Sequence, residues 1–264
     1  MRPVARTPLA ALVLFAFPAI LFPAACAPAE TEADALARRI ADASGGLAAW
    51  NALDVLRFDF VVLRDTAEAM RARHLWDRRA NRYRVEWPAG RDSTVVAVFD
   101  PGTFNAEAPA GQAAINGAPL SGEALAARLA QGYRRFINDT YWLLAPLKTR
   151  DPGVTRALAP DSATADTEAL ALAFEGVGLT PGDRYWLHAD RASGRLVAWT
   201  YLLQGDSVAV RWTWDDPAEL PARRGALRLP ARKTRADGAV TIRTDPRPAP
   251  SLADDLFTDL RPRL

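Results

Sequence analysis

Alternating apolar and polar positions dominate the chain after residue 55 and predict an antiparallel sheet. In Tyr83–Trp87, two aromatic residues and Val85 share one face, whereas Arg84 and Glu86 share the other. This period of two is typical of strands. Short turns such as Asp190–Gly194 join the segments, which favours the pairing of neighbours in hairpins. The predicted strands cover residues 56–64, 70–77, 83–87, 94–99, 112–115, 169–174, 184–190, 195–203, 207–214, 227–235 and 239–245.

Two other segments place apolar residues at helical spacing. The first is Thr31–Ala49, and we expect Gly45 and Gly46 to end or bend it. The second is Ser121–Leu144, in which Ser121 is a suitable N-cap and Pro146 follows as a stop signal. The sequence therefore predicts a mainly β protein with helices (α+β), in which two helical segments cover the sheet.

The N-terminus has the pattern of an export signal. Arg2 and Arg6 precede an apolar run from Leu9 to Phe22, which is short for a membrane span of about 20 residues. Cys26 follows two alanines, as in a bacterial lipobox, and would be acylated, for example with palmitate. We predict a signal peptide over 1–25, a lipid-anchored tether over 26–34 and one domain over 35–264. The alternative is an ordinary signal peptide that is cleaved before Glu30.

Export sets the compartment and limits the partners. A lipobox cysteine followed by Ala27 predicts the periplasmic side of the outer membrane, with a soluble periplasmic or secreted protein as the alternative. Loss of residues 1–25 removes Arg2 and Arg6 and leaves 31 basic residues against 31 acidic ones. Without a net positive charge, nucleic acid is not an expected partner. Cys26 is the only cysteine, so the domain is expected to fold without a disulfide.

The sequence offers few groups for catalysis. Its two histidines, His74 and His188, belong to no recognisable zinc motif, and no metal or cofactor is predicted. We expect both at a rim of the sheet, and Asp139, Lys148 and Asp151 as capping and loop-binding groups. The arginines between 71 and 84 are expected on a solvated face. A serine hydrolase assembled by the fold stays open, because such triads depend on geometry.

Aromatic residues gather on one face of the predicted sheet. They form either an ordinary core beneath the helical segments or the wall of an apolar cavity. The residues predicted for such a ligand cavity are Trp76, Trp87, Trp199, Tyr201, Trp212 and Trp214.

These features together resemble the Lol-type superfamily of periplasmic lipoprotein carriers, and more closely a group of secreted or lipid-anchored bacterial proteins within it. The stretches that carry the resemblance are Gly45-Gly46-Leu47 with Trp50 and Leu53, His74–Asp77, Tyr83–Glu86, Asn138–Lys148 with Asp151–Val154, Tyr185–Leu187, Asp190 and Gly194–Leu196.

The resemblance implies both a fold and a function. The fold is an unclosed antiparallel β half-barrel of about ten strands, covered by an N-terminal helix and a central helical segment. The function is noncovalent: a cavity in the half-barrel shelters lipid or the acyl chains of lipoproteins, in transport, acceptance or sensing. We therefore expect a binding protein rather than an enzyme. The alternatives are an envelope interaction protein with a filled core, a structural envelope lipoprotein and a hydrolase on the same sheet.

Overall fold

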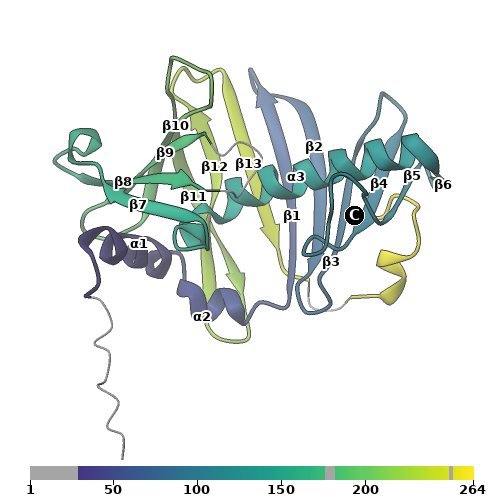
Figure 1. Ribbon diagram of the computed structural model, residues 1–264, viewed down its shortest axis with the longest axis horizontal. Coiled ribbons are helices and arrows are strands. Elements are labelled where there is room, and N and C mark those ends of the chain that lie inside the picture. Colours follow the sequence, from purple (N-terminus) through teal and green to yellow (C-terminus); the bar gives the residue numbers. More distant parts are fainter. Residues whose placement is uncertain (1–28, 176–181, 250–251) are drawn as a thin grey trace, which may run out of the picture. The chain divides into compact units, whose positions relative to one another are not determined.

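The described part of the chain forms one sheet of 13 antiparallel strands. The computed structural model describes residues 29–175, 182–249 and 252–264 (Figure 1). The predicted signal peptide and Cys26 lie outside the described residues. The spatial order of the strands is β6-β5-β4-β3-β2-β1-β13-β12-β11-β10-β9-β8-β7. Their bounds are β1 Val55–Arg64, β2 Ala67–Asp77, β3 Arg82–Pro88, β4 Thr94–Phe99, β5 Gln112–Ile115, β6 Ala118–Pro119, β7 Val154–Leu158, β8 Thr167–Phe174, β9 Arg184–Asp190, β10 Leu196–Leu202, β11 Val210–Pro221, β12 Ala226–Arg235 and β13 Val240–Arg247.

The sheet is open, because β6 and β7 stand at opposite ends of the strand order and each pairs with a single neighbour. The predicted fold class, an unclosed antiparallel sheet with helices, is therefore confirmed. The sheet has 13 strands, against the eleven ranges predicted from the pattern and the ten or so that the resemblance implies; β7, Val154–Leu158, is not among the predicted ranges. Strand 207–214 was expected to begin earlier than it does: β11 starts at Val210, and Val208 is 72% exposed.

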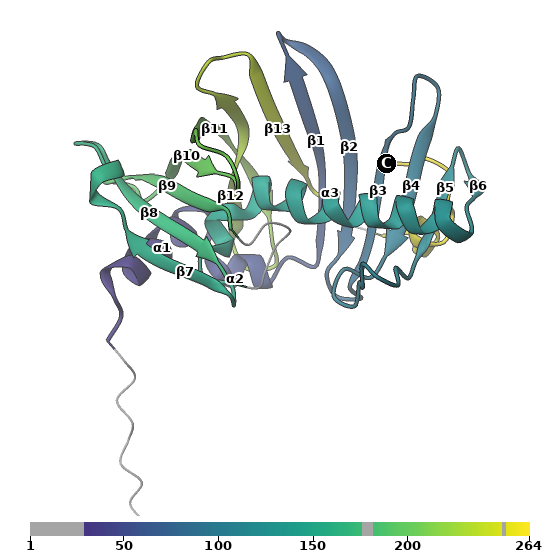
Figure 2. The ribbon, with the colours of Figure 1, turned by 45° about the horizontal axis from the view of Figure 1, so that its top comes forward.

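One long helix covers the sheet. Helix α3, Gly122–Lys148, runs across one face from β6 towards β7 (Figure 2), and we call this the covered face. Gly132 allows a close approach, since a Cβ atom there would lie 3.1 Å from the Cβ of Ala97. The predicted helix over 121–144 is confirmed, but it continues through Pro146. Proline near the end of a helix removes one hydrogen bond, and Ala145 and Leu147 on either side are buried in the core.

Two short helices complete the cover. Helix α1, Glu32–Ala43, is capped by Thr31, whose hydroxyl accepts a hydrogen bond from the Asp34 amide. Helix α2, Gly46–Asn51, follows directly. The break between them at Gly45, as predicted, has φ +99°, and a Cβ atom there would lie 2.3 Å from the carbonyl oxygen of Ala226. Glycine therefore lets the α1–α2 junction rest on β12. In the described residues, no helix is long and apolar enough to cross a membrane.

The C-terminal segment covers part of the opposite, outer face. Arg84 and Glu86 are 0% and 1% exposed, so the predicted solvated face is wrong for Arg84, whereas the side chain of Arg79 is exposed. The Arg84 guanidinium donates to Glu86 and to three backbone carbonyls, those of residues 256, 259 and 261. Glu86 in turn accepts from the amides of Arg263 and Leu264. Phe257 packs beside Leu75 in a small apolar cluster beneath this segment.

The covered face carries two apolar clusters that α3 joins. The larger contains α1, the C-terminal half of α3 and the inward side chains of β8 to β12. The smaller packs Leu129, Tyr133 and Phe136 of α3 against β3 and β4. Because one helix belongs to both clusters, its position relative to the sheet is fixed at both ends.

Candidate functional site

The six aromatic residues predicted for a cavity lie in two places. Four of them, on β10 and β11, belong to the larger cluster. Trp87 on β3 belongs to the smaller one, and Trp76 on β2 packs against both clusters. The structure therefore does not bring the six residues around a single space.

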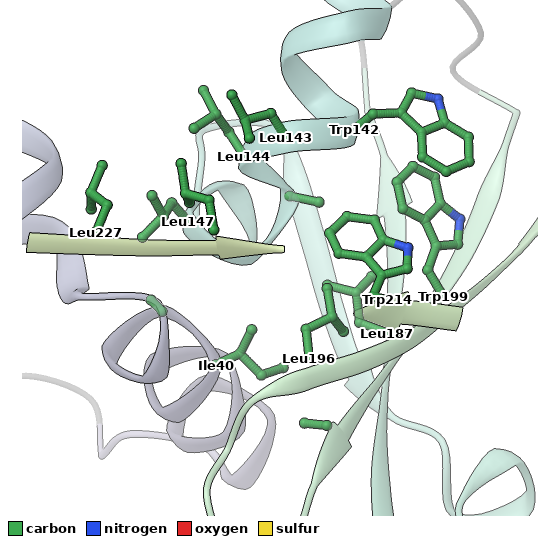
Figure 3. Packing of buried hydrophobic residues seen from close by; sticks show 14 of the residues in the cluster. Ile40, Trp142, Leu143, Leu144, Leu147, Leu187, Leu196, Trp199, Trp214 and Leu227 are labelled. Carbon is green, nitrogen blue, oxygen red and sulfur yellow. The ribbon is translucent and has the colours of Figure 1, made fainter. Parts of the chain in front are cut away.

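The four residues on β10 and β11 surround a helix side chain. Trp142 of α3 stacks on Trp199, with ring centroids 4.6 Å apart and an interplanar angle of 21° (Figure 3). It meets Trp212 edge-on at 4.9 Å, Trp214 at 6.4 Å and Tyr201 at 6.4 Å. We call Trp142, Trp199, Trp212 and Trp214 the tryptophan cluster. Its rings interlock as in a packed core, so a ligand between them would have to separate these contacts.

Sequence reasoning missed Trp142, although it lies within the stretch Asn138–Lys148 that carries the resemblance. Its burial, with 7% of its surface exposed, places it at the centre of the cluster. The sequence did offer one signal for Trp142: it lies in the helical segment that was expected to cover the aromatic face of the sheet.

Several buried donors in this region have no hydrogen-bond partner among the described residues. They are the indole nitrogens of Trp76, Trp199, Trp212 and Trp214 and the hydroxyl of Tyr141. A buried donor without a partner costs about 1–3 kcal/mol. Burial also raises the pKa of Tyr141 and Tyr185, so both phenols are neutral donors.

A groove of about 450 Å³ opens between α3 and the sheet. Its floor is apolar and comes from β1, β2, β13 and the edge of the tryptophan cluster. Its helix side carries amides, one carboxylate and two guanidinium groups. We call it the α3 groove; its lining residues are Phe60, Val62, Met70, Gln131, Arg134, Arg135, Asn138, Asp139, Trp142 and Ile242.

The cationic groups of the α3 groove are weakly neutralised. Arg134 is exposed, whereas the side chain of Arg135 is 19% exposed. The guanidinium of Arg135 lies 3.8 Å from Asp139 Oδ2 and 3.5 Å from Met70 Sδ. Its Cζ atom lies 5.3 Å from the centroid of the Trp87 ring. Its buried Nε has no hydrogen-bond partner in the described part of the chain. Burial lowers the pKa of Arg135, so the charged form would gain from a further anion.

A buried polar chain ties α3 to the sheet beside the groove. His74 Nε2 lies 3.2 Å from Asp139 Oδ2, and neither atom has a hydrogen-bond partner among the described residues. His74 Nδ1 lies 2.7 Å from the Tyr83 hydroxyl. Asn138 donates to the other oxygen of Asp139 at 2.8 Å, and Phe58 stacks on the imidazole at 4.3 Å. Burial, with the nearby Asp139 charge, raises the pKa of Tyr83.

These contacts correct two expectations from the sequence. His74 is fully buried rather than at a rim of the sheet, and Asp139 lies beside His74 rather than capping a helix. Lys148 and Asp151 do form a local ion pair, at 2.7 Å, where α3 ends. His188 is 3% exposed and shares its Nε2 with Thr200 and Arg211 at 3.0 and 2.8 Å.

Neither histidine forms the arrangement that would have favoured a hydrolase. In the described residues their side-chain partners are a tyrosine, an aspartate, a threonine and an arginine, with no serine hydroxyl among them. Nor does any group of three or more metal-ligating side chains occur in this described part.

One lysine is fully buried close to the tryptophan cluster. Lys233 is 0% exposed and donates to the Pro230 carbonyl at 2.5 Å and to the Thr244 hydroxyl. Its nitrogen lies 5.0 Å from the Trp214 ring centroid. Burial depresses the pKa of Lys233 well below its usual range.

A second, larger groove has a volume of about 1150 Å³. It lies beside the α1–α2 junction, where β10 and β12 begin and β11 ends. It forms where β10 and β11 diverge: they pair only from Ala198 to Tyr201. Its walls mix acidic residues such as Asp42 and Asp190 with Arg195 and Arg228. Because both signs of charge are present, this surface indicates no single class of ligand.

No protein-family model matches the sequence, and no curated protein matches it either. Among solved structures, a DUF1329 family protein from Desulfovibrio piger is similar with 10% identity and a TM-score of 0.44, over 84% of this chain and 94% of that chain. A LolA superfamily protein from Nitrosomonas europaea has 12% identity and a TM-score of 0.42, over 84% and 96%.

A domain from Vibrio parahaemolyticus, described as an outer-membrane lipoprotein-sorting protein domain, has 8% identity and a TM-score of 0.36, over 77% of this chain and 88% of that chain.

Proposed function

We propose that this protein binds the apolar chain of a lipid or lipoprotein in the α3 groove, and acts as a carrier, acceptor or sensor rather than as an enzyme. The observation that carries the proposal is an apolar floor beneath a helix that leaves about 450 Å³ open; Val62 and Met70 are half-buried there, and Phe60 and Ile242 are buried beside them. This volume lies within the range of about 300–1,000 Å³ that is usual for small-molecule sites.

The energy of such binding comes from burial of methylene groups. Each contributes about 0.8 kcal/mol, so a dozen contribute about 10 kcal/mol before the entropic costs of binding. No cofactor or nucleotide is needed for this. Trp142 lines the groove, and the cavity role predicted for Trp199, Tyr201 and Trp212 would require the groove to extend past its ring. Trp214 lines the second, larger groove.

The remaining two residues predicted for the cavity would contribute indirectly. Trp87 holds the guanidinium of Arg135, and Trp76 packs edge-on against Phe136 of α3 at 5.2 Å. Both therefore support the helix that roofs the groove, which is the role we propose for them.

We also propose that the domain is held at the periplasmic side of the outer membrane by acylated Cys26, through a tether over 26–34. Helix α1 begins within this tether, at Glu32. Changing Cys26→Ser is expected to release the protein into the soluble periplasmic fraction and to abolish labelling with palmitate analogues. A lipid-free mature protein that starts at Glu30 would contradict the anchor.

The groove is tested by filling it. Val62→Trp adds an indole to the floor. It is expected to weaken the binding of a fluorescent fatty acid at least about tenfold, because the added ring occupies the space of several methylenes. Val208→Trp is the matched control, since Val208 is 72% exposed outside the groove. Equal weakening by both variants would contradict the proposed site.

A second candidate function is an envelope interaction protein with a filled core. The interlocked tryptophan cluster favours it, because those rings leave their mutual space occupied. Absence of fatty-acid binding by the unmodified protein, together with a stable fold, would support this function instead.

A further inference from the structure

The helix side of the α3 groove carries more positive than negative charge. Arg134 and Arg135 face one carboxylate, Asp139. That carboxylate is 3% exposed and already lies within contact distance of His74 and Asn138. Gln131 and Asn138, the other polar residues of the lining, are neutral. The wall therefore holds one guanidinium charge that no carboxylate of the lining balances.

Arg135 in particular is placed to receive an anion. Its nearest carboxylate oxygen stands at 3.8 Å, too far for a hydrogen bond. Its buried Nε has no partner in the described residues. Guanidinium groups bind carboxylates and phosphates through paired hydrogen bonds, and Arg135 has unused donors for such a pair.

The apolar and cationic parts of the groove come from different elements, and Arg135 meets the floor at Met70 Sδ. The floor residues come from β1, β2 and β13, whereas the two arginines come from adjacent positions of α3. A neutral hydrocarbon would use the floor and leave the guanidinium groups without a partner. A molecule with a negative head and one chain would satisfy both walls.

We propose that the ligand of the α3 groove is a single-chain amphiphile with an anionic head, a carboxylate or a phosphate. This rests on the proposed function and adds the chemical class of its ligand. The head binds Arg135, with Arg134 supplying further positive charge at the opening. The chain lies on Phe60, Val62, Met70 and Ile242.

The test compares three probes with the same chain: hexadecanoate, hexadecyl phosphate and hexadecanol. Each displaces a fluorescent fatty acid from the intact protein. We expect at least one of the two anions to bind about tenfold or more tightly than the alcohol, since hydrogen bonds to charged groups are the stronger ones. Preference for one anion over the other identifies the head as carboxylate or phosphate.

Variants separate the charge from the groove. Arg134→Gln together with Arg135→Gln is expected to remove most of the preference for anions and to leave hexadecanol binding almost unchanged. Arg135→Lys keeps the charge and should retain part of the preference. Arg134→Gln alone, at an exposed position, should retain most of it. Arg150→Gln, on an exposed residue just beyond α3, is the matched control and should bind like the unmodified protein.

The outcomes distinguish this inference from the proposed function. Equal affinity for hexadecanol and both anions, or a preference that survives the double substitution, would overturn the anionic ligand while leaving the apolar groove intact. Failure of all three probes to bind the unmodified protein would overturn the proposed function and the inference with it.

Discussion

The C-terminal part of α3 and its middle cover the sheet in different ways. Its C-terminal half places Trp142 into the tryptophan cluster, where ring centroids lie 4.6 to 6.4 Å apart. Around its middle, polar residues from Gln131 to Asp139 face an apolar strip and leave the α3 groove open. The density of aromatic residues therefore does not by itself identify a ligand site. The better guide is an apolar wall opposite a polar one with space between them.

The largest expected effect tests whether the tryptophan cluster is a sealed core. Trp212→Ala removes a ring that is 4% exposed and should lower the free energy of unfolding by about 3–5 kcal/mol, because the helix above cannot collapse into the space. Chemical denaturation measures this. Trp186→Ala, on the opposite face of β9 and half-buried, should cost less. A small loss for Trp212→Ala would mean that the ring borders a void, and would revive its role in a cavity.

The next effect concerns the polar chain beside the groove. His74→Phe keeps the stacking on Phe58 but leaves the Asp139 carboxylate without its partner on the sheet. The free energy of unfolding should fall by up to about 3 kcal/mol, since a buried polar atom loses its polar neighbour on the sheet. Tyr83→Phe removes only one hydroxyl and should cost about 1 kcal/mol. If both variants unfold like the unmodified protein, the chain does not hold α3 to the sheet.

A pH effect of similar or smaller size should come from His188, on the face of β9 opposite the tryptophan cluster. Burial and the neighbouring Arg211 lower the pKa of His188 from 6.5 to about 4. The folded state therefore favours the neutral imidazole of His188. Its contribution to the free energy of unfolding is complete above pH 6.5 and is lost as the pH falls towards 4. The loss should be about 2–3 kcal/mol.

His188→Gln is the matched variant, because its amide can still bond Thr200 and Arg211 but does not titrate. Thermal unfolding across the same pH interval should show a smaller acid loss for this variant than for the unmodified protein. Identical acid profiles for the two proteins would show that His188 does not contribute to acid sensitivity.

Much of the fold could be predicted from local pattern. Period-two alternation and turn residues located most of the strands. Apolar residues at helical spacing after Ser121 located α3. The same alternation failed at Arg84 and Glu86, which it assigned to solvent. Their burial depends on the C-terminal segment, more than 160 residues away, and no local pattern encodes a contact of that kind.

The site was less predictable than the fold for a related reason. The aromatic strands were located, but what they face depends on Trp142 and on the path of α3 across the sheet. The α3 groove combines Val62, Met70 and Ile242 with Arg135, residues from four separate elements. None of these is unusual in sequence, and only the register of β1 with β2 and β13 brings the floor residues together.

The most direct test of the α3 groove is native mass spectrometry of the protein with hexadecanoate, beside Val62→Trp and Val208→Trp. We predict a complex with one bound chain for the unmodified protein and for Val208→Trp, and loss of that complex for Val62→Trp. An unmodified protein that carries no chain, or a Val62→Trp protein that carries as much as the control, would contradict the account.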